Sequence, residues 1–167
     1  MYAATLNGDD MEAFLKKHNL ISPRQYRQQA NALIRKKDYD GIFASCDEWV
    51  KNTDDPFFYM VVADACEQTK DLKRGVDWAR RCLERIGSYN RMLRFLLSAD
   101  FQLGRAEDAW LDWCRFRESF LWDEPENDNV LQLAVAAAIN TGRRLEAYTA
   151  LAPRFRTLRT ESPNFWF

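Results

Sequence analysis

Four short segments of the chain resemble one another at nearly constant intervals. They are KDYDGI (37–42), KDLKRG (70–75), GRAEDA (104–109) and GRRLEA (142–147), and their last residues are separated by 33, 34 and 38 positions. Each segment joins a short polar turn to a small or aliphatic residue, here called the anchor: Ile42, Gly75, Ala109 and Ala147. Self-similarity at such a period is typical of a chain that stacks copies of one supersecondary unit.

Apolar and small residues recur at fixed distances from the four anchors. They lie sixteen positions before the anchors (Tyr26, Tyr59, Leu93, Leu131), twelve positions before them (Ala30, Ala63, Leu97, Val135) and four positions after them (Cys46, Ala79, Trp113, Leu151). A spacing of four keeps side chains on one face of an α-helix. The pattern therefore predicts two helices per repeat, one on each side of the turn, whose small residues allow close packing.

Helix-capping signals agree with this division of the chain. Ser22-Pro23 followed by Gln25 combines an N-cap, a first-turn proline and a capping-box partner. Asp55-Pro56 repeats the first two of these signals, Gly87-Ser88 can end one helix and start the next, and Asn127-Asp128 can cap a later one. Strand signals are nearly absent, because no segment alternates cleanly between apolar and polar residues. We therefore expect an all-α fold.

From about Ser22 to about Leu158 the chain resembles the tetratricopeptide repeat family, whose repeats of about 34 residues each form a helical hairpin. The resemblance implies a right-handed superhelical stack of helix-turn-helix hairpins, with about three good repeats. Asp100, Arg144 and Arg154 stand where the pattern requires apolar residues, and Pro153 should stop or kink the last helix. The fourth repeat is therefore degenerate and is expected to cap the stack.

The same reasoning predicts three regions. Residues 1–21 form an N-terminal helix and cap, because Met11, Phe14 and Leu15 share one helix face. Residues 22–158 form the tetratricopeptide-like solenoid domain, and residues 159–167 form an aromatic C-terminal tail.

Charge and motif content narrow the function. The chain has 24 Lys plus Arg against 25 Asp plus Glu, so it lacks the positive excess that attracts nucleic-acid phosphates, and we expect no nucleic-acid partner. No 18-residue apolar run or signal peptide occurs, which predicts a cytoplasmic protein without membrane insertion. With one histidine (His18), no CxxC pair, no GxSxG, no HExxH and no phosphate-binding loop, the sequence predicts no metal, no cofactor and no enzymatic activity. The four cysteines are expected to serve mainly as small core residues.

In tetratricopeptide proteins the first helices of successive repeats line a concave groove that binds segments of partner proteins. Carried over to this chain, the predicted groove residues are Arg24, Arg27, Asn31, Arg35, Met60, Arg91, Arg94, Phe101, Gln102 and Gln132. The planar donor fork of arginine suits carboxylates, so the expected partner is an extended or helical, acidic segment of another protein. The alternative is that these side chains are only the solvated surface of their helices.

Two groups within the family are relevant to the partner. Arg27, Asn31 and Arg91 resemble positions that grip the terminal carboxylate of heat-shock chaperones, but Val61 stands where that clamp needs Asn and Phe95 where it needs a base. A complete clamp is therefore not expected, only a preference for acidic or extended polar segments. The length, leading helix and repeat number also resemble the tetratricopeptide chaperones of type III secretion.

Aromatic residues supply a second hypothesis. Trp113, Phe116 and Phe120 follow helical spacing and are expected in the core, whereas Trp110 and Trp122 can reach the convex surface as interface anchors. The contiguous Phe165, Trp166 and Phe167 should dock either on the last helices or on a partner. The leading hypothesis is thus a non-enzymatic interaction module, an adaptor or chaperone. The runner-up is a self-associating subunit of a larger assembly, including a homodimer.

Overall fold

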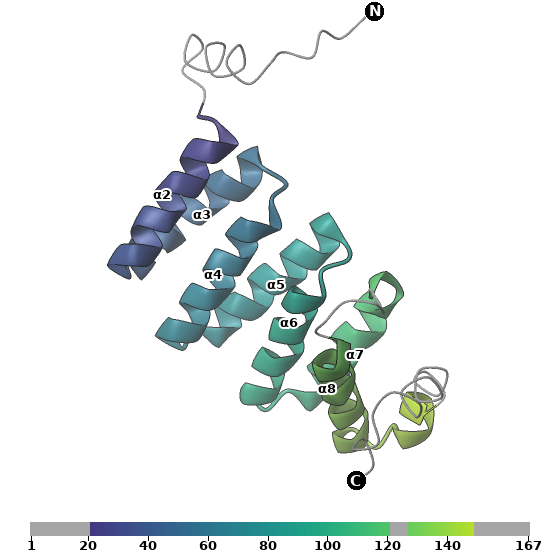
Figure 1. The fold of residues 1–167 in the computed structure, drawn as a ribbon. Coiled ribbons are helices and arrows are strands. Elements are labelled where there is room, and N and C mark those ends of the chain that lie inside the picture. Colours follow the sequence, from purple (N-terminus) through teal and green to yellow (C-terminus); the bar gives the residue numbers. More distant parts are fainter. Residues whose placement is uncertain (1–20, 121–126, 149–167) are drawn as a thin grey trace, which may run out of the picture. The chain divides into compact units, whose positions relative to one another are not determined.

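The computed structural model describes residues 21–120 and 127–148, and every regular element in these two ranges is helical (Figure 1). The α-helices are α2 (Pro23–Lys36), α3 (Tyr39–Asn52), α4 (Pro56–Thr69), α5 (Leu72–Ile86), α6 (Asn90–Gln102), α7 (Ala106–Phe116) and α8 (Asn127–Asn140). A short 3-10 helix, η1 (Arg117–Ser119), follows α7, and residues 144–148 are helical. The predicted all-α fold built from helical hairpins is confirmed.

Several predictions fall outside the described residues. They concern the N-terminal helix with Met11, Phe14, Leu15 and His18, the segment that contains Trp122, and the end of the last repeat with Leu151, Pro153 and Arg154. The aromatic tail with Phe165, Trp166 and Phe167 belongs to the same group.

The repeated turn has a definite backbone basis. In each of the four segments its first residue has a positive φ: 55° at Lys37, 63° at Lys70, 72° at Gly104 and 76° at Gly142. Around Lys37, Gly104 and Gly142 two backbone bonds then run back into the preceding helix, as in a Schellman motif, for example from Asp38 N to Leu33 O (3.0 Å). This left-handed residue stops one helix and turns the chain into the next.

Side-chain caps start several of the helices. The capping box predicted at Ser22 and Gln25 is present, with backbone–side-chain bonds of 2.8 and 3.2 Å. Asp38 accepts from Gly41 N (2.9 Å) at the start of α3, and Asp71 accepts from Arg74 N (3.4 Å) at the start of α5. Asp55 accepts from Phe57 N (3.0 Å) just ahead of Pro56. The α5 helix ends at Gly87 as predicted, whereas α6 begins after Tyr89 without a side-chain cap.

The chain divides into two compact units, unit 1 (Met1–Ala65) and unit 2 (Cys66–Phe167), and the boundary falls inside α4. In unit 1, α2 packs on α3 through Tyr26 and Ala30, and the Trp49 ring of α3 lies 5.4 Å from the Phe58 ring of α4. In unit 2, α5 packs on α6, and α6 also contacts α7 and α8. The α6 helix is therefore the central element of unit 2.

The predicted apolar stripe forms the core. Tyr26, Ala30, Tyr59, Ala63, Leu93, Leu97 and Leu131 are buried, as are Cys46, Ala79 and Trp113 after the anchors, while Val135 is partly exposed. Phe116 and Phe120 are also buried as predicted, and the rings of Phe120 and Trp113 lie 5.5 Å apart. Cys66 and Cys82 are buried, Cys114 is partly exposed, and no disulfide joins the four cysteines.

Gly75 lies where α5 packs closely against neighbouring side chains. A Cβ atom at this position would lie 2.8 Å from Cζ of Phe95 in α6 and 3.1 Å from Cβ of Cys66 in α4. At such distances a side chain fits only if these neighbours shift. The small anchor at this position is thus required by packing and not by backbone conformation.

Replacing Gly75 by Val is expected to lower the free energy of unfolding by about 1–3 kcal/mol, because the added methyl groups overpack the α4–α5–α6 contact. Urea unfolding of the full chain measures this change. Ala44→Val, which adds methyl groups at an exposed position in α3, should change the free energy by less than about 0.5 kcal/mol. Equal effects of the two substitutions would contradict the close approach at Gly75.

Candidate functional site

The exposed face of α2 carries most of the predicted groove residues of unit 1. Because Tyr26 and Ala30 are buried against α3, positions 24, 28, 31 and 35 lie on the opposite side of the helix. These residues are Arg24, Gln28, Asn31 and Arg35, and all four are exposed. The α2 helix also carries Arg27 and Lys36 and has no acidic residue.

Arg27 differs from this outer face, because it is held by unit 1 itself. Its Nε and Nη2 atoms both lie 2.6 Å from Oδ2 of Asp55, and its guanidinium lies 4.9 Å from the centre of the Phe57 ring. The fork predicted to grip a partner carboxylate therefore already holds a carboxylate of this chain. A partner would have to compete with Asp55, whereas the side chains of Asn31 and Arg35 form no hydrogen bond or ion pair with another described residue.

The other predicted groove residues have mixed exposure. Met60 in α4 is buried, and so it does not offer its side chain to a partner. In unit 2, Arg91 and Gln102 of α6 and Gln132 of α8 are exposed, while Arg94 and Phe101 are partly exposed. Arg91, Arg94 and Gln102 share the face of α6 opposite its buried residues. Since α2 and α6 belong to different units, a groove that includes both stays a prediction.

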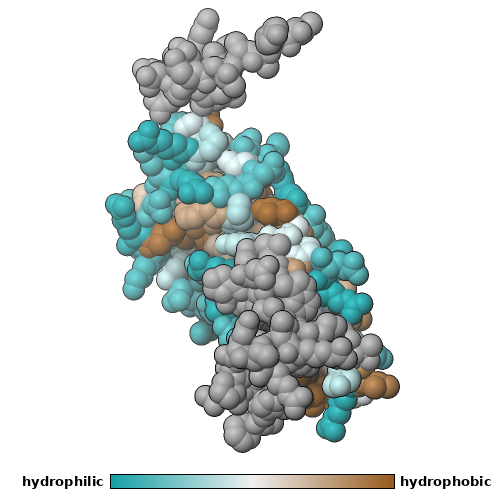
Figure 2. Space-filling view, turned by 45° about the vertical axis from the view of Figure 1, so that its right-hand side comes forward, coloured by the Kyte–Doolittle hydropathy of each residue, from teal (hydrophilic) through white to brown (hydrophobic). Residues whose placement is uncertain are grey.

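Of the aromatic residues predicted as interface anchors, Trp110 alone lies within the described residues. Trp110 was predicted to reach the surface, but only 4% of it is exposed, because it packs in the core of unit 2. Among the described residues, the exposed large apolar ones are Ile21, Ile34, Leu111, Ile139, Leu145 and Tyr148. Figure 2 shows that the visible surface of the described residues is hydrophilic over much of its area and hydrophobic in places.

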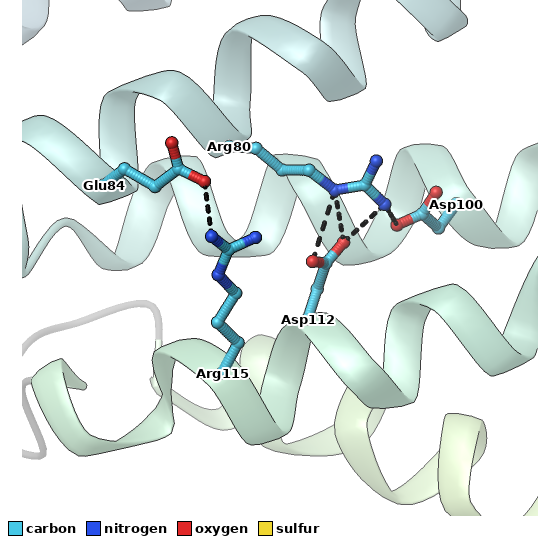
Figure 3. Close-up of polar contacts among 5 residues, drawn as sticks. All are labelled: Arg80, Glu84, Asp100, Asp112 and Arg115. Atoms are coloured by element: carbon cyan, nitrogen blue, oxygen red, sulfur yellow. Dashed lines mark hydrogen bonds and ion pairs between the residues drawn. The ribbon is translucent and has the colours of Figure 1, made fainter.

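A buried group of charges in unit 2, here called the charged cluster, consists of Arg80, Asp100 and Asp112 (Figure 3). Each comes from a different helix, α5, α6 and α7. Nε of Arg80 donates to both oxygens of Asp112 (3.2 and 3.0 Å), and Nη2 donates to Oδ2 of Asp112 (2.8 Å). The same Nη2 atom lies 3.7 Å from Oδ2 of Asp100. One guanidinium thus forms ion pairs with two carboxyl groups, and it donates hydrogen bonds to Asp112 alone.

Asp100 is the most deeply buried member of the charged cluster. Its side chain is 0% exposed, against 7% for Asp112 and 28% for Arg80. Neither of its carboxyl oxygens has a hydrogen-bond partner among the described residues. The pKa of Asp100 is raised to about 7: burial raises it most, the negative charge of Asp112 also raises it, and the positive charge of Arg80 lowers it in part. The hydrogen bonds with Asp112 in turn raise the pKa of Arg80.

The sequence interpretation missed the charged cluster. Asp100 was noted only as a departure from the apolar pattern, and neither Arg80 nor Asp112 was singled out. A signal was nevertheless present, because an acidic residue at a core position needs a partner. Arg80 lies 20 positions before Asp100 and Asp112 lies 12 positions after it, yet their spacing alone does not show that the three side chains meet.

In the part of the chain that the structure describes, the remaining cysteine, histidine and acidic side chains do not form a metal site. Burial raises the pKa of Cys82 to about 12 and also raises that of Cys114, which keeps both thiols protonated at neutral pH. Within residues 21–120 and 127–148, no three His, Cys, Asp or Glu side chains are grouped so that they could hold a metal ion. In the same ranges no helix has both the length and the apolar character of a membrane span.

Comparison of the chain with protein-family models, with curated proteins and with solved structures found no match in any of the three. Membership of the tetratricopeptide family therefore stays a prediction that rests on the repeat, the turns and the packed hairpins. The two local arrangements that remain as candidate sites are the exposed face of α2 and the charged cluster of unit 2.

Proposed function

We propose that this chain is a non-enzymatic protein–protein interaction module, and that the exposed face of α2 binds an acidic segment of a partner protein. The observation that supports the proposal most is the charge of α2, which has four basic residues and no acidic one in a chain of net charge −1. Arg24 and Arg35, at the two ends of the exposed face, are separated by eleven positions, or roughly 16 Å along the helix. That length suits about three turns of a helical segment or a short extended one.

The side chains on this face have the chemistry that such a partner needs. Arg35 can bind a carboxylate through two parallel hydrogen bonds, and the amide groups of Gln28 and Asn31 can donate to and accept from a peptide backbone or polar side chains. The side chains of Asn31 and Arg35 have no hydrogen bond or ion pair with described residues that binding would have to break. An acidic peptide is favoured over a nucleic acid, because the whole chain is not basic, with 24 Lys plus Arg against 25 Asp plus Glu.

Arg35→Glu is expected to weaken binding of a fluorescein-labelled oligoglutamate peptide to the full chain by about tenfold, the equivalent of one charge-assisted hydrogen bond. The matched control is Lys36→Glu, which makes the same change of charge in the same last turn and carries the same penalty from the helix dipole. Lys36 lies outside the row formed by Arg24, Gln28, Asn31 and Arg35, so this control should change binding by less than about threefold. Fluorescence anisotropy measures both affinities, and circular dichroism verifies that helix content is unchanged.

Two outcomes would overturn the proposal. Equal loss of affinity in the two variants would mean that the peptide responds only to overall charge. Tighter binding of a single-stranded oligonucleotide than of oligoglutamate at the same salt concentration would assign the face to nucleic acid.

A further inference from the structure

The charged cluster of unit 2 contains more negative than positive charge. If all three side chains are ionised, the cluster carries one net negative charge in the contact between α5, α6 and α7. The α8 helix, which also packs on α6, adds no compensating charge, because its one charged residue is Asp128 in its exposed first turn. Asp108 of α7 adds a further negative charge that acts on Asp100. No second cation from these helices faces Asp100.

The hydrogen bonds show which of the two carboxyl groups receives no hydrogen bond from Arg80. Arg80 gives three hydrogen bonds to Asp112, whereas its distance to Asp100 is 3.7 Å, beyond hydrogen-bond range. Asp100 is fully buried and has no donor among the described residues. Isolated buried carboxylates are strongly unfavourable, and such a group normally becomes neutral by keeping its proton.

We propose that the charged cluster is a proton-responsive contact between α5, α6 and α7, here called the structural joint of unit 2. In it, Asp100 carries a proton that makes the cluster neutral. Loss of this proton to solvent weakens the packing of α6 against α5 and α7. The upward shift of the Asp100 pKa, caused mainly by burial, places this change near neutral pH. When Asp100 is protonated, its hydroxyl can donate to Asp112, which satisfies a carboxyl group that otherwise has no partner. This inference concerns unit 2 and does not depend on the binding proposed for α2.

The direction of the pH effect follows from linkage. The pKa of Asp100 is raised in the folded chain, so the folded state holds this proton over a range in which the unfolded state has released it. The stability that protonated Asp100 contributes is fully present below its unfolded pKa of about 4, and it is lost as the pH rises through the folded value of about 7. Within this window the unfolding constant of the wild type should rise by up to about tenfold per pH unit relative to a variant without the carboxyl group.

The test compares urea unfolding of the full-length wild type with that of Asp100→Asn at several pH values between about 4.5 and 8.5. The ratio of their unfolding constants should increase with pH and level off above neutrality. Asp77→Asn, which removes a carboxylate from the exposed side of α5, is the matched control and should keep the pH dependence of the wild type. A ratio of wild type to Asp100→Asn that is constant with pH would overturn the proposal.

Infrared spectroscopy keeps the proposal testable if Asp100→Asn does not fold. The folded wild type at neutral pH should show the carbonyl band of a protonated carboxylic acid, and this band should disappear as the pH is raised by about two units. Absence of the band at neutral pH would equally overturn the proposal.

Discussion

Arg80→Met is expected to lower the free energy of unfolding by about 3–5 kcal/mol at neutral pH, the usual result of removing one partner from a buried ion pair. Methionine has a similar length and fills much of the same space, so the change acts through charge and hydrogen bonding. It removes all three hydrogen bonds that Asp112 receives from Arg80 and leaves two carboxyl groups, 7% and 0% exposed, without their cation. Urea unfolding of the full chain measures the loss.

A second arginine in unit 2 provides a matched control for Arg80→Met. Arg115 of α7 forms an ion pair with Glu84 of α5 at 2.7 Å (Figure 3). This pair joins the same two helices as Arg80 and Asp112, but here the arginine is on α7 and the acidic residue on α5. Its side chain is 56% exposed and that of Glu84 is 47% exposed. Because water and salt screen such a pair, Arg115→Met should lower the free energy of unfolding by less than about 1 kcal/mol. Equal effects of the two substitutions would show that the charged cluster is not a structural joint.

Combining substitutions separates charge from volume. If the loss in Arg80→Met comes from buried carboxyl groups left without their cation, adding Asp100→Asn and Asp112→Asn should restore much of the stability, because no buried carboxyl group then lacks that cation. If the loss came from the missing arginine volume, the triple variant would be no more stable than Arg80→Met. The combination therefore tests the physical reason for the prediction as well as its size.

The sequence predicted the helical hairpins because the information they require is local. Lys37 and Gly104 stand at equivalent places in the repeat, and both adopt the left-handed conformation that ends a helix. Asp38 caps the helix that follows the first of these turns. The apolar stripe is similarly local, since a spacing of four residues decides which side chains share a helix face.

The parts that the sequence did not predict depend on contacts between distant residues. Arg27 was interpreted as a binding residue, but Asp55, 28 positions later, holds its guanidinium. Asp100 was interpreted as a defect of the repeat, but burial beside Arg80 and Asp112 makes it part of the charged cluster. Trp110 was predicted to lie on the surface but is buried. Helical periodicity does not reveal how much of the surface of α7 the rest of unit 2 covers. For Arg27 and Asp100 the deciding neighbours lie outside the residue's own helix.

Trp49→Ala is expected to have a comparably large effect in unit 1, lowering the free energy of unfolding by about 3–5 kcal/mol. Trp49 is fully buried on α3, its Nε1 atom donates to Oε1 of Gln29 in α2 (3.3 Å), and its ring contacts that of Phe58 in α4. It therefore connects α2, α3 and α4 through one side chain. The measurement is again urea unfolding, followed by circular dichroism.

Tyr26→Phe is the milder control for Trp49→Ala. It keeps the buried ring but removes the hydroxyl that donates to Glu48 (3.0 Å) and accepts from Asn52 (3.0 Å), so a loss of about 1 kcal/mol is expected. A loss below this value for Trp49→Ala would contradict its central role in unit 1.

Trp49→Ala and Arg35→Glu together separate the effects on folding from those on binding. Because Trp49 contacts α2 from α3, Trp49→Ala should reduce binding of the acidic peptide only together with stability. Arg35→Glu should reduce binding while shifting the unfolding transition no more than Lys36→Glu does.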